Sequence, residues 1–276
     1  MKMGQEHLAP YGSYKSRHDF TQRQLMSCLI LKVYLKTTYR GVIDWLSGHK
    51  ALREILGLEE KLPHYTALQK FSARPGAGEA AEAMIARIGL AGLRREGKKA
   101  AIAIDSTGFE PSGASPYYIS RTGRKCNRFR KLSVSVVCGC ILPLGIVLDW
   151  GPSNDKKQAP ELLTKSFQHA GEHMPASLLG DAGFDADWVH GVCREVWAVK
   201  SWIKPVIQRK DGTIGGYYRP LMTDKALKTN RYGKRWHVES FFSGLKRLCG
   251  STLNARLDLC QRNEIIFKVL AYALHR

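Results

Sequence analysis

The spacing of the apolar residues changes near residue 99, and this change constrains the fold more than any other feature of the sequence. Beyond it, three segments rich in Val, Ile, Leu and Cys follow one another at residues 99–109, 132–140 and 141–150. Each is bounded by Gly, Pro or charged residues, as strands are. Helical and strand patterns then alternate. Three leading strands followed by this alternation predict an α/β fold, a mixed sheet with helices on its faces.

Five further elements are predicted after the three strands, in the order helix, strand, helix, strand, helix. A Gly-rich, basic stretch at residues 208–232 separates the last strand from the last helix. The Leu-Pro-Leu-Gly segment at residues 142–145 predicts a tight turn between the second and third strands. The five elements cover residues 155–170, 177–181, 185–195, 197–207 and 235–248.

The part of the chain before the strands carries helical patterns only. Asp19 or Thr21 can cap the start of the first helix, and Gly57 is placed to stop the second. Three short helices in sequence are compatible with a helix-turn-helix unit that binds DNA, and equally with helices that only pack together. The three patterns cover residues 19–37, 42–56 and 64–74.

Pro75, Gly76 and Gly78 predict a break in the chain, and an alanine-rich helix follows it. This break divides the chain into three parts. They are a helical domain at residues 1–78, a connecting helix at 79–98 and an α/β domain at 99–276.

The balance of charge is strongly positive. Lys and Arg number 43 against 24 Asp and Glu, a formal net charge of +19. Residues 199–276 alone hold 16 basic and 5 acidic side chains, so the excess is concentrated toward the C-terminus. A field of this sign attracts polyanions, of which nucleic acid is the most common in a cell. A basic protein without such a partner and a membrane-surface binder are the alternatives on charge alone.

The cysteines and the N-terminal residues indicate where the protein works. The seven cysteines form no Cys-x2-Cys pair, and an odd number cannot all be bridged within one chain, so we expect reduced, mostly buried thiols and no zinc site. Residues 1–14 lack an apolar run of the length found in signal peptides, and no segment reaches the roughly 20 apolar residues of a membrane span. The expected location is the cytoplasm. The cysteines are Cys28, Cys126, Cys138, Cys140, Cys193, Cys249 and Cys260.

Two aspartates occupy the places where a sheet enzyme holds its ligands. Asp105 ends the apolar run Ala-Ile-Ala-Ile and precedes Ser-Thr-Gly, and Asp181 ends Leu-Leu-Gly and precedes Ala-Gly-Phe. Open sheets bind ligands where apolar strands end in loops. Either aspartate alone could cap a turn. Together they favour an acidic site at the edge of the sheet.

Glu239 lies in the last predicted helix. At about 100° per residue, Tyr232, Arg235, Glu239 and Lys246 fall within roughly 40° of one line, provided that the helix extends back to Tyr232. The apolar residues of the same helix lie in the neighbouring sector of its surface. If that sector packs on the sheet, Glu239 lies at the edge of the contact between helix and sheet. The alternative is a solvated face on which Arg235 and Glu239 form an ordinary i,i+4 pair.

Three other acids compete for a place in the site: Asp155, Asp185 and Asp187. Asp155 and Asp185 stand where helices need an N-cap, and we expect them to cap.

The last helix resembles a signature of the DDE transposases of bacterial and archaeal insertion sequences, Tyr-x2-Arg-x3-Glu-x6-Lys. Tyr232, Arg235, Glu239 and Lys246 match it at every spacing. The Ile-Asp-Ser-Thr-Gly segment at Asp105 and the Gly-Asp-Ala-Gly-Phe-Asp segment at residues 180–185 are similar to the aspartate motifs of that family. The resemblance covers nearly the whole chain, and it implies a ribonuclease-H-like catalytic core behind a helical N-terminal region.

The resemblance implies a catalytic site in which Asp105, Asp181 and Glu239 hold two Mg²⁺ ions, with Asp105 shared between them. Mg²⁺ prefers carboxylate and water oxygens, and Mn²⁺ can substitute for it. The resemblance assigns the remaining positions of the signature, Tyr232, Arg235 and Lys246, to contacts with the terminal DNA. Trp236 and His237 are further candidates for contact with a displaced base, although core packing is the favoured interpretation of Trp236.

The implied partner is double-stranded DNA, namely the terminal inverted repeats of the element and the target. A homodimer on DNA and a place at the nucleoid follow, because two ends must be joined, and no membrane is involved. Some family members carry a long β-rich insertion between the second aspartate and the glutamate. Here any insertion is small and confined to about residues 209–231, so a hairpin step that depends on a long one is not implied.

Three other functions remain compatible with the sequence. A ribonuclease-H-like nuclease that cleaves without joining would use the same acids. A non-catalytic, domesticated DNA-binding protein would use the N-terminal helices and keep its function without Asp105. A carboxylate-based hydrolase of neutral substrates would work in EDTA and would leave the net charge of +19 unexplained.

Overall fold

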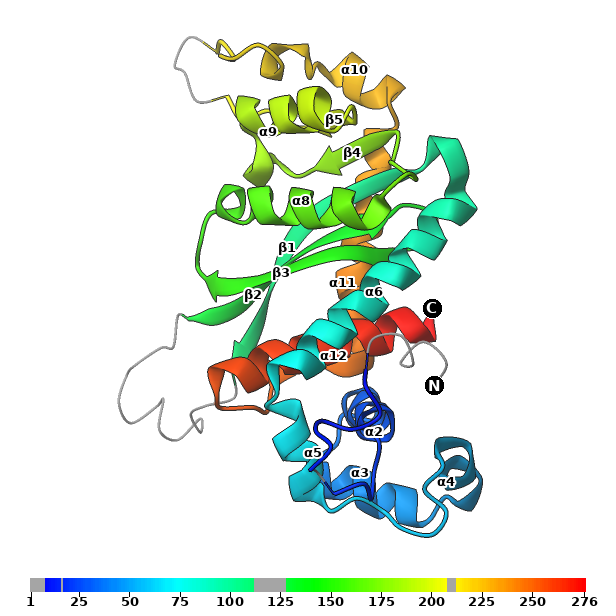
Figure 1. Ribbon diagram of the computed structural model, residues 1–276. Coiled ribbons are helices and arrows are strands. Elements are labelled where there is room, and N and C mark those ends of the chain that lie inside the picture. The colour runs from blue at the N-terminus through cyan, green and yellow to red at the C-terminus, as the bar shows by residue number, and fades with distance from the viewer. Residues whose placement is uncertain (1–7, 16, 112–127, 208–211) are drawn as a thin grey trace, which may run out of the picture. The chain divides into compact units, whose positions relative to one another are not determined.

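A computed structural model describes residues 8–15, 17–111, 128–207 and 212–276 (Figure 1). The chain forms two compact units that do not follow chain order. The first combines residues Met1–Ile85, Glu110–Lys125 and Leu245–His275, and the second combines Ala86–Phe109, Cys126–Gly244 and Arg276.

The second unit is built on a mixed sheet, as predicted. Its strands lie in the order β3-β2-β1-β4-β5. β1 is antiparallel to β2 and parallel to β4, and β4 is parallel to β5. This arrangement, with helices on both faces (Figure 1), confirms the α/β class and is consistent with a ribonuclease-H-like core. The strands are β1 (Ala101–Pro111), β2 (Phe129–Val137), β3 (Leu142–Gly151), β4 (Ser177–Gly180) and β5 (Lys200–Ile203).

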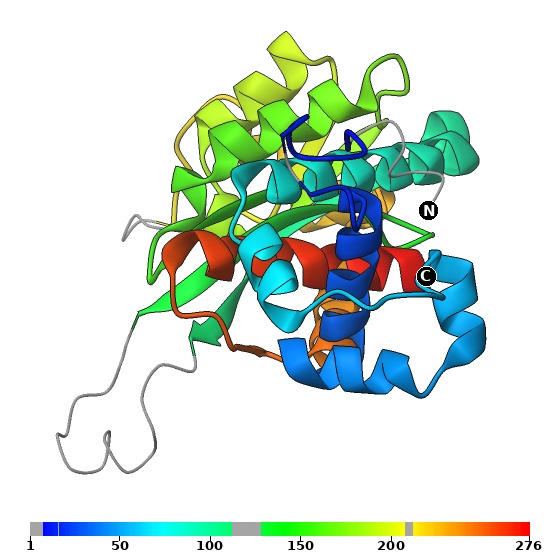
Figure 2. The ribbon, with the colours of Figure 1, turned by 60° about the horizontal axis from the view of Figure 1, so that its bottom comes forward.

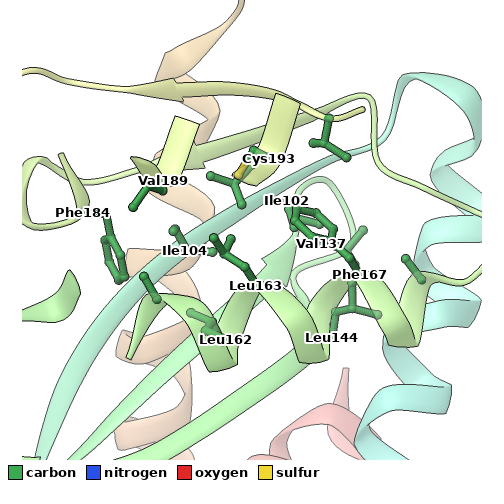
Figure 3. Close-up of a cluster of buried hydrophobic side chains, with 14 of the residues drawn as sticks. Ile102, Ile104, Val137, Leu144, Leu162, Leu163, Phe167, Phe184, Val189 and Cys193 are labelled. Atoms are coloured by element: carbon green, nitrogen blue, oxygen red, sulfur yellow. The ribbon is translucent and has the colours of Figure 1, made fainter. Parts of the chain in front are cut away.

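The core of this unit lies between the sheet and helix α8 (Ala159–Ala170). Leu162, Leu163 and Phe167 of α8 pack against Ile102 and Ile104 of β1 (Figure 3). Because side chains alternate along a strand, the odd-numbered residues of β1 point to the other face. That face is covered by α11 (Trp236–Cys249), which Figure 1 shows on the side of the sheet away from α8.

The predicted alternation of helices and strands in this part of the chain is confirmed, although the bounds of the elements differ from those predicted. Residues 212–231 of the expected insertion form a short 3₁₀ turn and a helix, and residues 209–211 lie outside the described residues. The predicted final helix begins at Trp236 and is preceded by a 3₁₀ turn. The remaining elements are η2 (Asp155–Lys157), η3 (Ala182–Phe184), α9 (Asp187–Gly191), the π-helical turn η4 (Val192–Val196), η5 (Arg219–Leu221), α10 (Asp224–Thr229) and η6 (Tyr232–Arg235).

The tight turn predicted at residues 142–145 is wrong. Val137 pairs with Leu142, so the turn consists of residues 138–141, and residues 142–145 belong to β3. Gly139 has a φ of +99°, a conformation that glycine adopts at no steric cost. Pro143 is tolerated because β3 is an edge strand, where a missing N–H does not interrupt the sheet.

The first unit is helical. The long helix α12 (Asp258–His275), which the sequence analysis missed, packs across α2 and also contacts α5 (Figure 2). The second predicted helix is two helices, α3 and α4, interrupted near Gly48. The short strand β6 (Thr252–Leu253) pairs with the end of β1. The N-terminal helices are α2 (Gln22–Tyr34), α3 (Tyr39–Ser47), α4 (Lys50–Leu56) and α5 (Tyr65–Ser72).

The helix ends follow local capping chemistry. Thr21, and not Asp19, caps α2, because its side chain accepts from the Gln24 N–H while the Gln24 side chain accepts from the Thr21 N–H. Gly57 ends α4 in the left-handed conformation, as predicted. The predicted break between the third helix and the alanine-rich helix exists at residues 73–74, but α6 (Pro75–Glu96) begins at Pro75 rather than at residue 79, so Gly76 and Gly78 lie inside it. Proline suits the first position of a helix, where its missing N–H is not needed.

The predicted boundaries at residues 78 and 98 and the helix-turn-helix role of the N-terminal helices stay predictions. The six cysteines within the described residues are free, five of them buried, and Cys126 lies outside these residues. In the described part of the chain, no helix combines the length and the apolar character that a bilayer crossing requires.

Candidate active site

Asp105 lies within β1, on the face of the sheet opposite the α8 core. Its neighbour Ile104 points into that core, so the Asp105 side chain points the other way. Its Oδ1 accepts a hydrogen bond from the backbone N–H of Ser106 at 2.7 Å, and the side chain is 20% exposed. The carboxylate is therefore fixed at a partly buried point of the sheet surface.

Asp181 directly follows β4, and the register of the sheet brings it beside Asp105. The parallel strands β1 and β4 pair Ile104 with Gly180, so Asp105 and Asp181 are the next residues in the same register. Neighbouring strands lie about 4.8 Å apart, and residues in register project from the same face. The Asp181 side chain makes no capping hydrogen bond to the described backbone of η3. Its carboxylate is thus not occupied by its own turn.

Arg235 connects Asp105 with Glu239. Glu239 lies in the first turn of α11, and Arg235 lies in the 3₁₀ turn just before it. Nη1 of Arg235 lies 3.5 Å from Oδ2 of Asp105, and Nη2 donates to Oε1 of Glu239. The i,i+4 pair considered in the sequence analysis therefore exists. It does not lie on an independent solvated face, because the same guanidinium contacts Asp105.

The electrostatics of the site show that the acids interact. Burial raises the pKa of Asp105 to about 6, and the negative charge of Asp181 adds to this effect, against the Ser106 hydrogen bond and the charge of Arg235. Burial would lower the pKa of Arg235, but the acids around it raise that pKa overall. These three acids are Glu239, Asp181 and Asp105. One guanidinium thus interacts with all three acids.

The donor atoms have the chemistry that a hard divalent cation requires, because all are carboxylate oxygens. Within the described residues, however, no three acidic, histidine or cysteine side chains lie close enough together to surround one ion. The acids are instead associated in pairs, Asp105 with Asp181 through the sheet and Asp105 with Glu239 through Arg235. The Arg235 guanidinium lies between Asp105 and Glu239 and balances part of their charge.

A family model described as a transposase DDE domain matches residues 96–274 of the chain. The chain belongs to this transposase family. A comparison with curated proteins finds no similar sequence. Membership means that the substrate of the enzyme is DNA, and members of the family generally use a divalent metal.

The other residues expected to bind DNA in this transposase do not share one environment. The hydroxyl of Tyr232 donates to the backbone oxygen of Gly180 at 3.0 Å, next to Asp181. Trp236 is 53% exposed and stacks on His237, so core packing of Trp236 is wrong. Lys246 belongs to the first unit, where burial lowers its pKa and the charge of Glu110 opposes this effect.

The expected capping roles of Asp155 and Asp185 are wrong. Asn154 caps η2 with its side chain, and Asp155 instead pairs with Lys131 at 2.7 Å. Asp185 precedes α9, but its fully buried carboxylate binds Arg219.

The Asp185 contacts close a loop of the transposase. Arg219 donates from Nε to Oδ1 at 2.8 Å and from Nη2 to Oδ2 at 2.6 Å, and the Val206 N–H donates to the same carboxylate at 2.7 Å. The rival acid Asp187 accepts from the backbone N–H groups of Tyr218 and Arg219. The two acids therefore fix described residues on either side of positions 208–211, namely Val206 before them and Tyr218 and Arg219 after them. Sequence reasoning missed Arg219, because no spacing rule relates it to a partner 34 residues away.

Proposed function

We propose that this transposase cuts the ends of an insertion sequence and joins them to target DNA, and that Asp105, Asp181 and Glu239 carry both reactions. The observation that supports this assignment most strongly is the register of β1 and β4, which aligns Asp105 with Asp181. Arg235 contacts both Asp105 and Glu239 of α11, and so links the pair of aspartates to the glutamate. Residues separated widely in the sequence thus surround one guanidinium on one face of the sheet.

In this proposal Asp105 and Asp181 hold one Mg²⁺ ion, and Asp105 and Glu239 hold a second, with Mn²⁺ as a substitute. When bound, such ions neutralise the phosphate and activate the attacking oxygen. The raised pKa of Asp105 fits this role, because a carboxylate that is partly buried beside another acid gains from an added positive charge. Arg235 must release at least one of its acids for both ions to bind.

The same face of α11 contacts the DNA in this proposal. Arg235, once released from a carboxylate, holds a phosphate through its planar guanidinium. Trp236 is exposed beside it and supplies a stacking surface for an unpaired base, with His237 behind it. Lys246, seven residues after Glu239, contributes charge to the bound terminal DNA. Tyr232 donates its hydroxyl to Gly180 and is only half-buried, so it can also touch the DNA.

Water first attacks the phosphodiester at the transposon end and displaces the 3′-oxygen of the transposon strand. The freed 3′-hydroxyl then attacks a phosphodiester of the target, which joins the two strands and releases a 3′-hydroxyl on the target. The signature of Tyr232, Arg235, Glu239 and Lys246 supports an origin in an insertion sequence. Two ends must be cut and joined together, which favours a homodimer on the terminal inverted repeats. The net charge of +19 favours a location at the nucleoid.

A strand-transfer assay separates this proposal from a nuclease that only cleaves. The purified protein is mixed with labelled donor ends that already carry a free 3′-hydroxyl, together with supercoiled target DNA and Mg²⁺. We expect joined products that depend on Mg²⁺ and vanish in EDTA. Cleavage of uncut ends without any joining of pre-cut ends would instead support the nuclease, and full function in EDTA would exclude metal-dependent catalysis.

A further inference from the structure

The turn that follows Asp181 is confined on two sides. Residues 182–184 form the 3₁₀ turn η3, in which the backbone N–H of Phe184 donates to the backbone carbonyl oxygen of Asp181 at 2.9 Å. Phe184 is fully buried in the α8 core. Gly183, between them, faces the carboxylate of Asp155: a Cβ at Gly183 would lie 2.4 Å from Oδ2 of Asp155. Only glycine fits at this position without movement of the turn or of Asp155.

Asp155 is itself held firmly. Its Oδ1 lies 2.7 Å from Nζ of Lys131, whose side chain is only 6% exposed. Lys131 also donates to the backbone oxygen of Ser153 at 2.5 Å. The ammonium group is therefore fixed between the strand β2 and the start of η2. The ion pair with Lys131 restrains Oδ1 of Asp155, although this oxygen accepts no hydrogen bond, and Oδ2 is the atom that faces Gly183.

Capping does not explain Asp155, because Asn154 caps η2. A role in surface solubility does not explain it either, because its partner Lys131 is buried. Removing that charge from water has a desolvation cost, which a simple surface ion pair would not have. Asp155 thus contacts the turn that follows Asp181.

We propose that Asp155, anchored by Lys131, is a positioning residue that packs against Gly183 and fixes the turn presenting Asp181 to the metal. The inference rests on the proposed function, because it assumes that Asp181 is a metal ligand. Groups that orient a ligand commonly change metal affinity about 10- to 100-fold when they are lost.

The test measures Mn²⁺ binding to the full chain without DNA, from the loss of the free-ion signal in electron paramagnetic resonance. We expect Gly183→Ala to weaken Mn²⁺ binding at least about tenfold, because the added Cβ displaces the turn. Asp155→Ala removes the support and is expected to weaken binding to a similar extent. The double variant should bind no worse than Asp155→Ala alone, since the new Cβ enters the space that the carboxylate has left.

Two control variants match these changes. Gly191→Ala adds the same Cβ where the nearest atom is 3.8 Å away. Asp149→Ala removes an acid whose partners are Gln158, Lys157 and the Trp150 N–H. Both controls should keep the wild-type Mn²⁺ affinity. Circular dichroism and the unfolding midpoint report whether each variant folds, and if Gly183→Ala does not fold, Lys131→Met decides, because it frees Asp155 and is expected to weaken Mn²⁺ binding.

Wild-type affinity in Gly183→Ala, or a double variant whose loss equals the product of the single losses, would overturn the inference. Asp181→Asn separates this failure from a failure of the proposed function. If Asp181→Asn abolishes Mn²⁺ binding while the Asp155 and Gly183 variants bind normally, only the positioning role falls. If Asp181→Asn itself binds normally, the proposed metal site is wrong.

Discussion

Asp105→Asn, Asp181→Asn and Glu239→Gln are each expected to reduce Mg²⁺-dependent cleavage of transposon ends by at least about a thousandfold. The reason is that a bound divalent ion contributes several kcal/mol of charge stabilisation at the phosphate, and each 1.36 kcal/mol changes a rate about tenfold. Cleavage of end DNA under single-turnover conditions measures the loss. Binding to the same DNA, followed by gel shift, should remain largely intact.

Glu161→Gln provides a matched control for the glutamate. Glu161 forms an exposed i,i+4 pair with Lys165 on α8, just as Glu239 pairs with Arg235, but it has no contact with Asp105 or Asp181. Its replacement should leave cleavage unchanged. Normal cleavage by any of the three site variants would remove that residue from the proposed site, and normal function of Asp105→Asn would favour a domesticated DNA-binding protein.

Asp185→Ala is expected to lower the free energy of unfolding by about 3–5 kcal/mol, because it leaves the Arg219 guanidinium partly buried without its carboxylate. The Asp185 side chain is fully buried and also accepts from the Val206 N–H, so water cannot easily replace it. Unfolding in urea, followed by circular dichroism, measures the change. The segment from Val206 to Arg219 should also become more accessible to protease.

Asp19→Ala is the control for this prediction, since Asp19 pairs with Lys61 at the surface and exposed pairs contribute little. We expect almost no change in stability for this variant. A loss below about 1 kcal/mol in Asp185→Ala would show that the Arg219 contact is dispensable.

The parts of the fold that could be predicted from the sequence are those where the apolar residues follow one spacing, either that of a helix or that of a strand. β1 begins with four apolar residues, Ala-Ile-Ala-Ile, β2 ends with Val-Ser-Val-Val, and α8 has a clear apolar side, so their types and order were predicted correctly. Helix α12 was missed for a physical reason. It is buried on nearly all sides, with Gln261, Asn263, Glu264 and Lys268 among its buried residues, so it has no apolar stripe to detect.

The candidate site shows the same division. Asp181 follows the end of β4, as predicted, whereas Asp105 lies within β1, which continues to Pro111, and not at the end of a strand. The spacing in the last helix left Glu239 open, and the resemblance to the transposase signature singled it out. The partners of the rival acids could not be predicted. Asp155 begins η2 and Asp185 stands just before α9, positions that favour capping, but their carboxylates bind Lys131 and Arg219, whose positions depend on the tertiary fold. The exposure of Trp236 likewise depends on what α11 packs against.

The central claim is that Asp105, Asp181 and Glu239 surround the bound metal. Iron-directed cleavage tests it most directly: Fe²⁺ replaces Mg²⁺, ascorbate and peroxide generate hydroxyl radicals at the ion, and mass spectrometry locates the cuts in the polypeptide. We expect cuts near residues 105, 181 and 239 that excess Mg²⁺ suppresses. Cuts that cluster elsewhere in the chain, or that excess Mg²⁺ does not suppress, would contradict it.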